Sequence, residues 1–202
     1  MLTSVSKLKD AKADLRAKLF SRLDFSDFSE IDFVRKGLDF FQDLKKEKKV
    51  SDPLSVSAYW PMDCHEMPTS GLLKSLHERG CCCLLPVPDA SATQPLRFVE
   101  WTPSVQLVRG PLGTWIPEGS LRIFKVPNVI LLPVVAYDAE GYRLGRGGGY
   151  YDATLRFFRS NPKDFLLAVG LAHSSQKVSN VPRQIHDEKM DAVLTQCGWA
   201  WF

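Results

Sequence analysis

Apolar and polar positions along this chain follow two different periods. Short, nearly continuous apolar runs are typical of strands buried on both faces, and they occupy residues 56–60, 81–87, 129–137, 165–172 and 192–195. Helical spacing of apolar residues appears between them, at 8–23, in one or two helices within 24–50, at 71–79 and at 151–159. Strands alternating with helices predict an α/β fold with a mostly parallel central sheet.

Turn residues set the boundaries of several of these elements. Thr69 or Ser70 is the expected N-cap of the helix at 71–79, and Gly80 is its expected C-terminal cap. The sequence Asp-Ala-Glu-Gly at 138–141 predicts a turn after the apolar run. Prolines, glycines and tryptophans punctuate residues 95–124 around two strand-like pieces, 96–101 and 113–118, which predict an antiparallel edge hairpin and a loop returning to the central strand.

Composition narrows the class of protein. With 202 residues, 45% of them hydrophobic, the chain can bury one substantial core, and we expect a single domain over residues 1–202. The N-terminus has no signal-peptide pattern and no apolar run is long enough for a membrane span, so we expect a cytoplasmic protein without a membrane partner. A net charge of +3 without a basic stripe predicts no nucleic-acid partner. We expect a monomer.

The five cysteines show no disulfide framework, which suits a reducing compartment. Three of them are adjacent, at 81–83, within a predicted strand. Consecutive strand residues point to opposite faces, and no second Cys-x-x-Cys pair is present, so core packing is favoured over a zinc site.

The densest group of unusual residues is Arg-Leu-Gly-Arg-Gly-Gly-Gly-Tyr-Tyr-Asp at 143–152. Glycine at 145, 147, 148 and 149 lets backbone N–H groups converge on an anion, and Arg143 and Arg146 add guanidinium groups suited to phosphate. A buried strand precedes this loop and a helix follows it, an arrangement that binds phosphate at a helix N-terminus. Neither the P-loop nor the dinucleotide fingerprint fits, because Tyr150 and Tyr151 occupy the diagnostic positions. The alternative is a flexible, solvent-exposed glycine turn.

Other charged residues are candidates for the same site. Lys12 and Arg16 fall inside the apolar stripe of the first helix, where they either snorkel from its edge or face a phosphate or carboxylate. The loop after the strand at 56–60 carries Asp63, His65 and Glu66, which are either site residues or an ordinary polar connector. Asp187 and Asp191 are acidic candidates near the C-terminus, with turn hydrogen bonds as the alternative role.

The segment 143–152 closely resembles the signature of the 5-formyltetrahydrofolate cyclo-ligases, also called methenyltetrahydrofolate synthetases, and the resemblance extends from about Lys12 to Thr195. It implies a Rossmann-like three-layer sandwich. It also implies an ATP site formed by Lys12, Arg16, Arg143, Leu144, Gly145, Arg146, Gly147, Gly148, Gly149, Tyr150 and Tyr151. The implied folate site comprises Trp60, Pro61, Glu66, Gly148, Gly149 and Tyr150, with Glu66 accepting from the pterin. Asp152 and Asp191 are the implied ligands of Mg²⁺.

Two departures from the family pattern are visible. Gly148 stands where many members carry a lysine, so a phosphate contact from that lysine is absent here or comes from elsewhere. Pro117 precedes Glu118 in the segment that resembles a bordering element of the family site, so Trp115 and Glu118 are left outside the predicted set.

The implied reaction is the closure of 5-formyltetrahydrofolate to 5,10-methenyltetrahydrofolate, with ATP as co-substrate and Mg²⁺ as cofactor, through a phosphorylated formyl group that releases phosphate beside ADP. Arg146 and Tyr150 are the expected catalytic residues. Two rival functions remain open at this point: a phosphosugar isomerase or transferase on a similar sheet, and a non-catalytic folate- or nucleotide-binding regulator.

Overall fold

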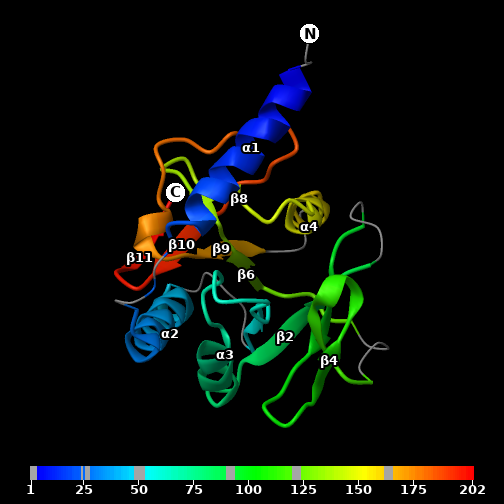
Figure 1. Cartoon of the computed structure of the whole chain (residues 1–202). Helices are drawn as coiled ribbons and strands as arrows, with labels where there is room; N and C mark the ends of the chain where they lie inside the picture. Colours follow the sequence, from blue (N-terminus) through cyan, green and yellow to red (C-terminus); the bar gives the residue numbers. More distant parts are fainter. Residues whose placement is uncertain are drawn as a thin grey trace.

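The computed structural model describes residues 4–23, 25, 28–47, 53–89, 94–119, 124–161 and 166–202 (Figure 1). Its helices are α1 (Ser4–Phe20), α2 (Glu30–Lys46), α3 (Ser70–His77) and α4 (Tyr150–Arg159). Its strands are β1 (Ser55–Ser57), β2 (Cys82–Val87), β3 (Arg97–Glu100), β4 (Leu107–Arg109), β5 (Trp115–Pro117), β6 (Val129–Pro133), β7 (Ala136–Tyr137), β8 (Arg143–Leu144), β9 (Leu167–Leu171), β10 (Ala192–Thr195) and β11 (Gly198–Trp201). None of the described helices has the length and apolar character that a membrane span requires.

A seven-stranded sheet in the order β11-β10-β9-β6-β1-β2-β3 forms the centre of the molecule. The five inner strands pair in parallel, whereas β3 and β11 pair antiparallel at the two edges. The chain moves from β1 to its neighbour β2 through α3, and from β6 to its other neighbour β9 through α4. The direction of winding therefore reverses between β1 and β6, the place where open α/β sheets bind ligands.

Helices cover both faces of this sheet (Figure 1). On one face α2 buries Phe33, Phe40, Phe41 and Leu44 at helical spacing, beside the buried leucines of α3. On the other face α4 buries Leu155 and Phe158 in a second core cluster. The predicted α/β class with a mostly parallel sheet between helical layers is confirmed.

Local signals placed several elements correctly. Thr69 occupies the N-cap position of α3, although its hydroxyl donates to Tyr59 O at 2.6 Å instead of capping the helix. Gly80 adopts a φ of +79° after the helix, and Cys81 N donates back to Leu76 O, as expected for a glycine cap. Cys81 and Cys83 are buried in the core, and burial raises the pKa of Cys83 to about 12, so the core-packing interpretation holds.

The predicted single strand at 129–137 is wrong, because the chain leaves the main sheet after Pro133. Val135 N instead donates to Leu144 O, and β7 pairs with β8 in a separate two-stranded ribbon. The predicted turn at 138–141 joins those two strands, and the Asp138 carboxylate accepts from the backbone of Glu140 and Tyr142. An apolar run alone does not reveal where a strand changes sheets.

The prediction for residues 95–124 is also wrong in its pairing. The first piece, β3, pairs with β2 at the sheet edge, whereas the second piece, β5, pairs with β4 in its own hairpin. The edge strand β11 was not predicted, because its short Gly-Trp-Ala-Trp segment offers no long alternation. Within 24–50, one helix, α2, occupies 30–46; part of this stretch, including 48–50, lies outside the described residues.

Candidate active site

A cavity of about 610 Å³ lies at the carboxyl edge of the sheet, at the switch point between β1 and β6. Tyr59 and Trp60 reach it from the end of β1, Pro88 from the end of β2, and Pro133 from the end of β6. The glycine loop, α1, the β4–β5 hairpin and the segment before β10 supply the remaining walls. Its size is within the range of small-molecule sites.

The glycine loop borders this cavity along residues 145–149 and leads into α4. Gly147 has a φ of +106°, and Gly149, at the N-cap position of α4, has a φ of +71°, a conformation that other residues rarely adopt. No side chain caps this helix end, so the first N–H groups of α4 keep their capacity to bind an anion.

Gly148 affects the loop in a different way, through the space that its missing side chain leaves. A Cβ atom built there would lie 2.9 Å from Tyr150 Cδ2, because the Tyr150 ring folds back against the loop. Any larger residue at 148, including the lysine of the family pattern, requires that ring to move. The glycine at 148 therefore leaves room for the Tyr150 ring where it lies in this structure.

Arg146 joins the glycine loop to the loop after β1. Its Nε donates to Glu66 Oε1 at 2.7 Å, and its Nη2 donates to Asp63 Oδ1 at 2.7 Å. Burial lowers the pKa of Arg146, but its hydrogen bonds to the two carboxylates and their negative charges outweigh burial, and the net direction is upward. Glu66 Oε2 accepts from Met62 N at 2.8 Å, so this carboxylate is fixed from both sides.

Lys12 and Arg16 both reach the cavity from α1. Lys12 Nζ lies 2.6 Å from Asp187 Oδ2, and Arg16 Nε donates to Gly145 O at 2.7 Å. Burial lowers the pKa of Arg16, and the nearby charge of Asp187 opposes that shift. The structure thus places Arg16 against the glycine loop and Lys12 against Asp187. Leu15 and Leu19 of the same apolar stripe pack on the β7–β8 ribbon.

Arg143 is more deeply buried than Arg146, the other arginine of this segment. Its side chain is 3% exposed, its Nη2 lies 3.2 Å from Asp152 Oδ1, and its Nη1 donates to Glu188 O at 2.9 Å. Leu144 is buried in the small core beneath the ribbon. These two residues border the cavity, but their side chains are committed to internal contacts that hold the loop in place.

Aromatic side chains form one wall of the cavity. Tyr59 Oη donates to Met67 O at 2.9 Å, and the Trp60 and Trp101 rings lie 5.9 Å apart. Burial raises the pKa of Tyr151, so its hydroxyl stays protonated. Of the predicted folate residues, Trp60, Glu66 and Tyr150 line the cavity, whereas Pro61 does not.

The two predicted metal ligands are not brought together. Asp152 lines the cavity, where its Oδ1 accepts from Glu188 N at 2.9 Å. Asp191 precedes β10, at the amino edge of the sheet, where both its oxygens lie 3.1 Å from Arg159 Nη2 and Oδ2 accepts from Ala168 N. Across the described ranges, no cluster of three or more histidine, cysteine or acidic side chains forms a ready metal cage. Asp152 is therefore the better placed of the two candidates.

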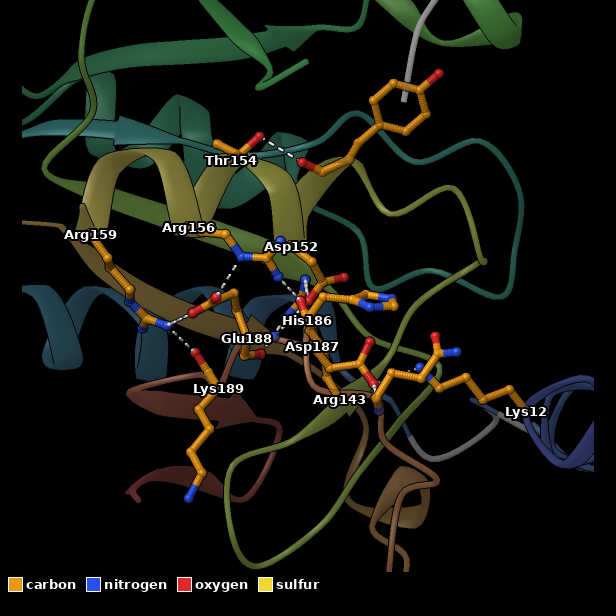
Figure 2. A network of polar contacts seen from close by, with 12 residues as sticks. Lys12, Arg143, Asp152, Thr154, Arg156, Arg159, His186, Asp187, Glu188 and Lys189 are labelled. Atoms are coloured by element: carbon orange, nitrogen blue, oxygen red, sulfur yellow. Dashed lines mark hydrogen bonds and ion pairs between the residues drawn. The ribbon is translucent and has the colours of Figure 1, made fainter. Parts of the chain in front are cut away.

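Sequence reasoning missed several residues of the cavity wall. The β4–β5 hairpin brings Leu112, Thr114 and Trp115 to the wall, although Glu118 stays outside it. Gln184, His186 and Asp187 line it from residues 184–191, a segment called the strap below. Figure 2 shows how α4 holds this strap: Arg156 donates to His186 O, and Arg159 donates to Lys189 O. Of the three strap residues that line the cavity, Asp187 alone was a sequence candidate, because polar connectors carry no distinctive spacing.

Several known proteins resemble this chain in sequence or in fold. A model of the 5-formyltetrahydrofolate cyclo-ligase family matches residues 8–196. The 5-formyltetrahydrofolate cyclo-ligase of Haemophilus influenzae is 28% identical over 179 residues, covering 82% of this chain and 94% of that protein. The Escherichia coli protein of the same name is 32% identical over 143 residues, covering 67% of this chain and 75% of that protein.

A solved structure with the same architecture belongs to the 5,10-methenyltetrahydrofolate synthetase of Aquifex aeolicus. It matches with a TM-score of 0.70 and 26% identity, covering 94% of this chain and 92% of that one. Sequence and fold therefore point the same way: the chain belongs to the 5-formyltetrahydrofolate cyclo-ligase family and is an enzyme of that family.

Proposed function

We propose that this enzyme closes 5-formyltetrahydrofolate to 5,10-methenyltetrahydrofolate in a reaction driven by ATP and Mg²⁺, with ADP and phosphate as the other products. The observation that carries the proposal is that one cavity is lined by the glycine loop, by the cations Lys12, Arg16 and Arg146, and by the aromatic side chains of Tyr59, Trp60, Trp115, Tyr150 and Tyr151. The loop and the cations suit a triphosphate, and the aromatic side chains suit a flat heterocycle.

Three kinds of group are proposed to bind the triphosphate. Backbone N–H groups at the start of α4 and in the glycine loop attract anions through the helix dipole. Lys12 and Arg16 add positive charge from α1, and Arg146 adds a guanidinium group from the loop itself. Phosphoryl transfer depends chiefly on positioning and charge neutralisation, which these groups supply together.

The groups proposed to bind the pterin are a hydrogen-bond acceptor and aromatic ring surfaces. Glu66 carries a carboxylate that can accept two adjacent N–H groups, the pattern offered by the pterin edge. Met62 N and Arg146 Nε already orient this carboxylate. Trp60 and Tyr150 line the same cavity and provide ring surfaces against which a pterin can stack.

The chemistry follows from the weak leaving ability of an amide-like oxygen. Transfer of the γ-phosphoryl group breaks its bond to the oxygen that leaves with ADP, forms a new P–O bond to the formyl oxygen and turns that oxygen into a good leaving group. The neighbouring amine then attacks the formyl carbon and gives up its N–H proton to solvent, and the C–O bond breaks as phosphate departs. Arg146 is the proposed neutralising group for the transferred phosphoryl, and Tyr150 is proposed to hold the folate against the loop. The route needs no covalent protein nucleophile.

Mg²⁺ fits this site through Asp152. Magnesium is usually bound by one or two carboxylates together with substrate phosphates and water, so a dedicated cage is unnecessary. Asp152 stands at the start of α4 beside the glycine loop, and its Oδ2 is available beyond the Oδ1 that meets Arg143 and Glu188 N. When bound, the ion would neutralise phosphate charge. Asp191 is the less suitable candidate because Arg159 holds both its oxygens.

Purified protein tests the proposal directly. With 5-formyltetrahydrofolate and Mg-ATP we expect methenyl absorbance to rise only when protein and ATP are both present, with one phosphate released per methenyl group formed. Binding of folate or nucleotide without turnover would contradict the proposal and favour a non-catalytic regulator. Isomerisation of a phosphosugar without ATP would favour the other rival.

A further inference from the structure

Among the described residues that line the cavity, cations outnumber carboxylates by five to three. The cations are Lys9, Lys12, Arg16, Arg143 and Arg146, and the carboxylates are Glu66, Asp152 and Asp187. Each carboxylate lies in an ion pair with one of these cations: Glu66 with Arg146, Asp152 with Arg143, and Asp187 with Lys12. Lys9 and Arg16 remain, so the cavity keeps an excess of positive charge that favours an anionic ligand.

Lys9 differs from the other four cations because its ammonium group has no protein partner. Arg16 Nε donates to Gly145 O at 2.7 Å, whereas the Lys9 side chain forms no hydrogen bond or ion pair with any described residue. Lys9 lines the cavity and is nevertheless exposed, which places it at the cavity mouth. All three N–H groups of its ammonium are therefore available to a ligand.

Lys9, Lys12 and Arg16 form a row along one face of α1. At about 100° per residue the three positions lie within about 60° of one another, and about 10 Å of helix axis separates the first from the last. Figure 1 shows that α1 leads away from the sheet toward the N-terminus. The row therefore runs from the glycine loop, where Arg16 meets Gly145 O, outward to Lys9 at the mouth.

We propose that Lys9 is a further phosphate-binding residue, which contacts the polyphosphate chain of the nucleotide at the mouth of the cavity. A row of cations suits a linear polyanion, because each phosphate group along the chain meets positive charge. This inference rests on the proposed function, since it assumes that ATP occupies the cavity. It adds a residue outside the ATP site that the family resemblance implies, which begins at Lys12.

The competing ligand for Lys9 is the glutamate portion of the folate, which also carries carboxylates. The nucleotide is favoured because Lys9 continues the row that Arg16 begins at the glycine loop, whereas the acceptor for the pterin, Glu66, belongs to the loop after β1. The two ligands predict different kinetic changes, so one variant distinguishes them.

Steady-state kinetics of Lys9→Met test the proposal. At low ionic strength and fixed free Mg²⁺, KM for ATP should rise by about 3-fold with little change in kcat, as expected for the loss of one exposed charge contact to a bound substrate. The ratio of variant to wild-type KM should fall toward one in high salt, which screens exposed charges. KM for 5-formyltetrahydrofolate should stay unchanged, whether the folate carries one glutamate or five. An unchanged KM for ATP would overturn the proposal. A rise confined to the substrate with five glutamates would also overturn it and assign Lys9 to the folate tail.

Lys7→Met is the matched control. It removes the same charge from an exposed position of α1 two residues away, which helical geometry turns to the opposite face, and it should leave KM for ATP unchanged. Lys9→Arg should keep a KM for ATP close to that of the wild type, and Lys9→Glu should raise it more than Lys9→Met. The same order of effects at position 7 would show a general response to net charge and would contradict a specific contact at Lys9.

Binding measurements separate this inference from the proposed function. Calorimetric titration with a non-hydrolysable ATP analogue should give a Kd about 3-fold higher for Lys9→Met than for the wild type. A wild type that shows this difference and forms no methenyl product would refute the proposed function alone. Turnover by the wild type, together with equal Kd values for the two proteins, would refute the role of Lys9 alone.

Discussion

Two networks of arginines and carboxylates, built from the same kinds of residue, lie in different parts of this molecule. The cavity network joins Arg146 to Asp63 and Glu66 beside the glycine loop. The strap network joins Arg159 to Glu188 and Asp191 at the C-terminal end of α4. Both have short contacts and partly exposed side chains, so residue type and geometry alone do not tell a functional network from a structural one.

Their positions relative to the sheet distinguish them. The cavity network lies at the carboxyl ends of the parallel strands, where the switch point opens a site, whereas Asp191 precedes β10 at the amino edge. Arg159 lies seven positions after Asp152 in α4, which is about 10 Å of helix at 1.5 Å per residue. One helix thus serves the cavity with its first turn and the strap with its last.

Removal of Arg146 should give the largest effect. Arg146→Ala deletes the proposed neutralising group, and losing one such donor typically lowers kcat by about 100-fold or more. We expect ATP-dependent turnover to fall by that amount while the far-UV circular dichroism spectrum stays native. Steady-state kinetics check this outcome, and unchanged kinetics would remove Arg146 from the site.

The two aspartates assigned to Mg²⁺ provide the next test. Asp152→Asn should raise the Mg²⁺ concentration needed for half-maximal activity by about 10-fold, because it weakens the one well-placed carboxylate. Asp191→Asn should leave this requirement unchanged and lower thermal stability instead, since its partners are Arg159 and Ala168 N. Titration of each variant with Mg²⁺ decides between them. Equal effects of the two variants on the Mg²⁺ requirement would support both aspartates as metal ligands, as the family resemblance implies.

Disruption of the strap network alone should be milder. Arg159→Ala removes contacts to Asp191 and to Lys189 O at a partly exposed site, which we expect to lower the free energy of unfolding by about 1 kcal/mol. For a domain of this size that corresponds to a fall in Tm of about 2–4 °C. Differential scanning calorimetry measures it. A large loss of kcat without a fall in Tm would show that the strap network takes part in turnover.

The smallest expected effect is the loss, at acid pH, of the stability that Asp63 contributes. Burial raises the pKa of Asp63, but hydrogen bonds from Arg146 and from His65 N outweigh burial and hold it below its ordinary value of 3.8. A carboxyl with a depressed pKa contributes stability above pH 3.8, and that contribution is lost as the pH falls through the lower folded value. Because Asp63 is 39% exposed, the contribution stays below about 1 kcal/mol. Urea unfolding of wild type and Asp63→Asn should differ at pH 5 and converge below pH 3.

Several features of the site were predictable from the sequence because they depend on near neighbours. The glycine pattern predicted a loop with positive φ before a helix, and Gly147 and Gly149 have that conformation. The placement of Lys12 and Arg16 within an apolar stripe made both of them candidates for the site, and both reach the cavity. Other features were not predictable. The exit of the chain from the sheet after Pro133 depends on pairing between β7 and β8, which no apolar run encodes.

The sequence by itself determined the alternation of the main strands and helices, the glycine loop and the family, because periodicity, glycine conformation and a continuous signature are local properties. Only the tertiary structure decided which acid meets which base. Asp187 meets Lys12 across 175 residues, Arg146 meets Asp63 across 83, and Asp191 meets Arg159 away from the cavity. Such pairings depend on where the strands end and how the connecting segments cross them. Residue type and spacing therefore could not show in advance that Asp187 lines the cavity and Asp191 does not.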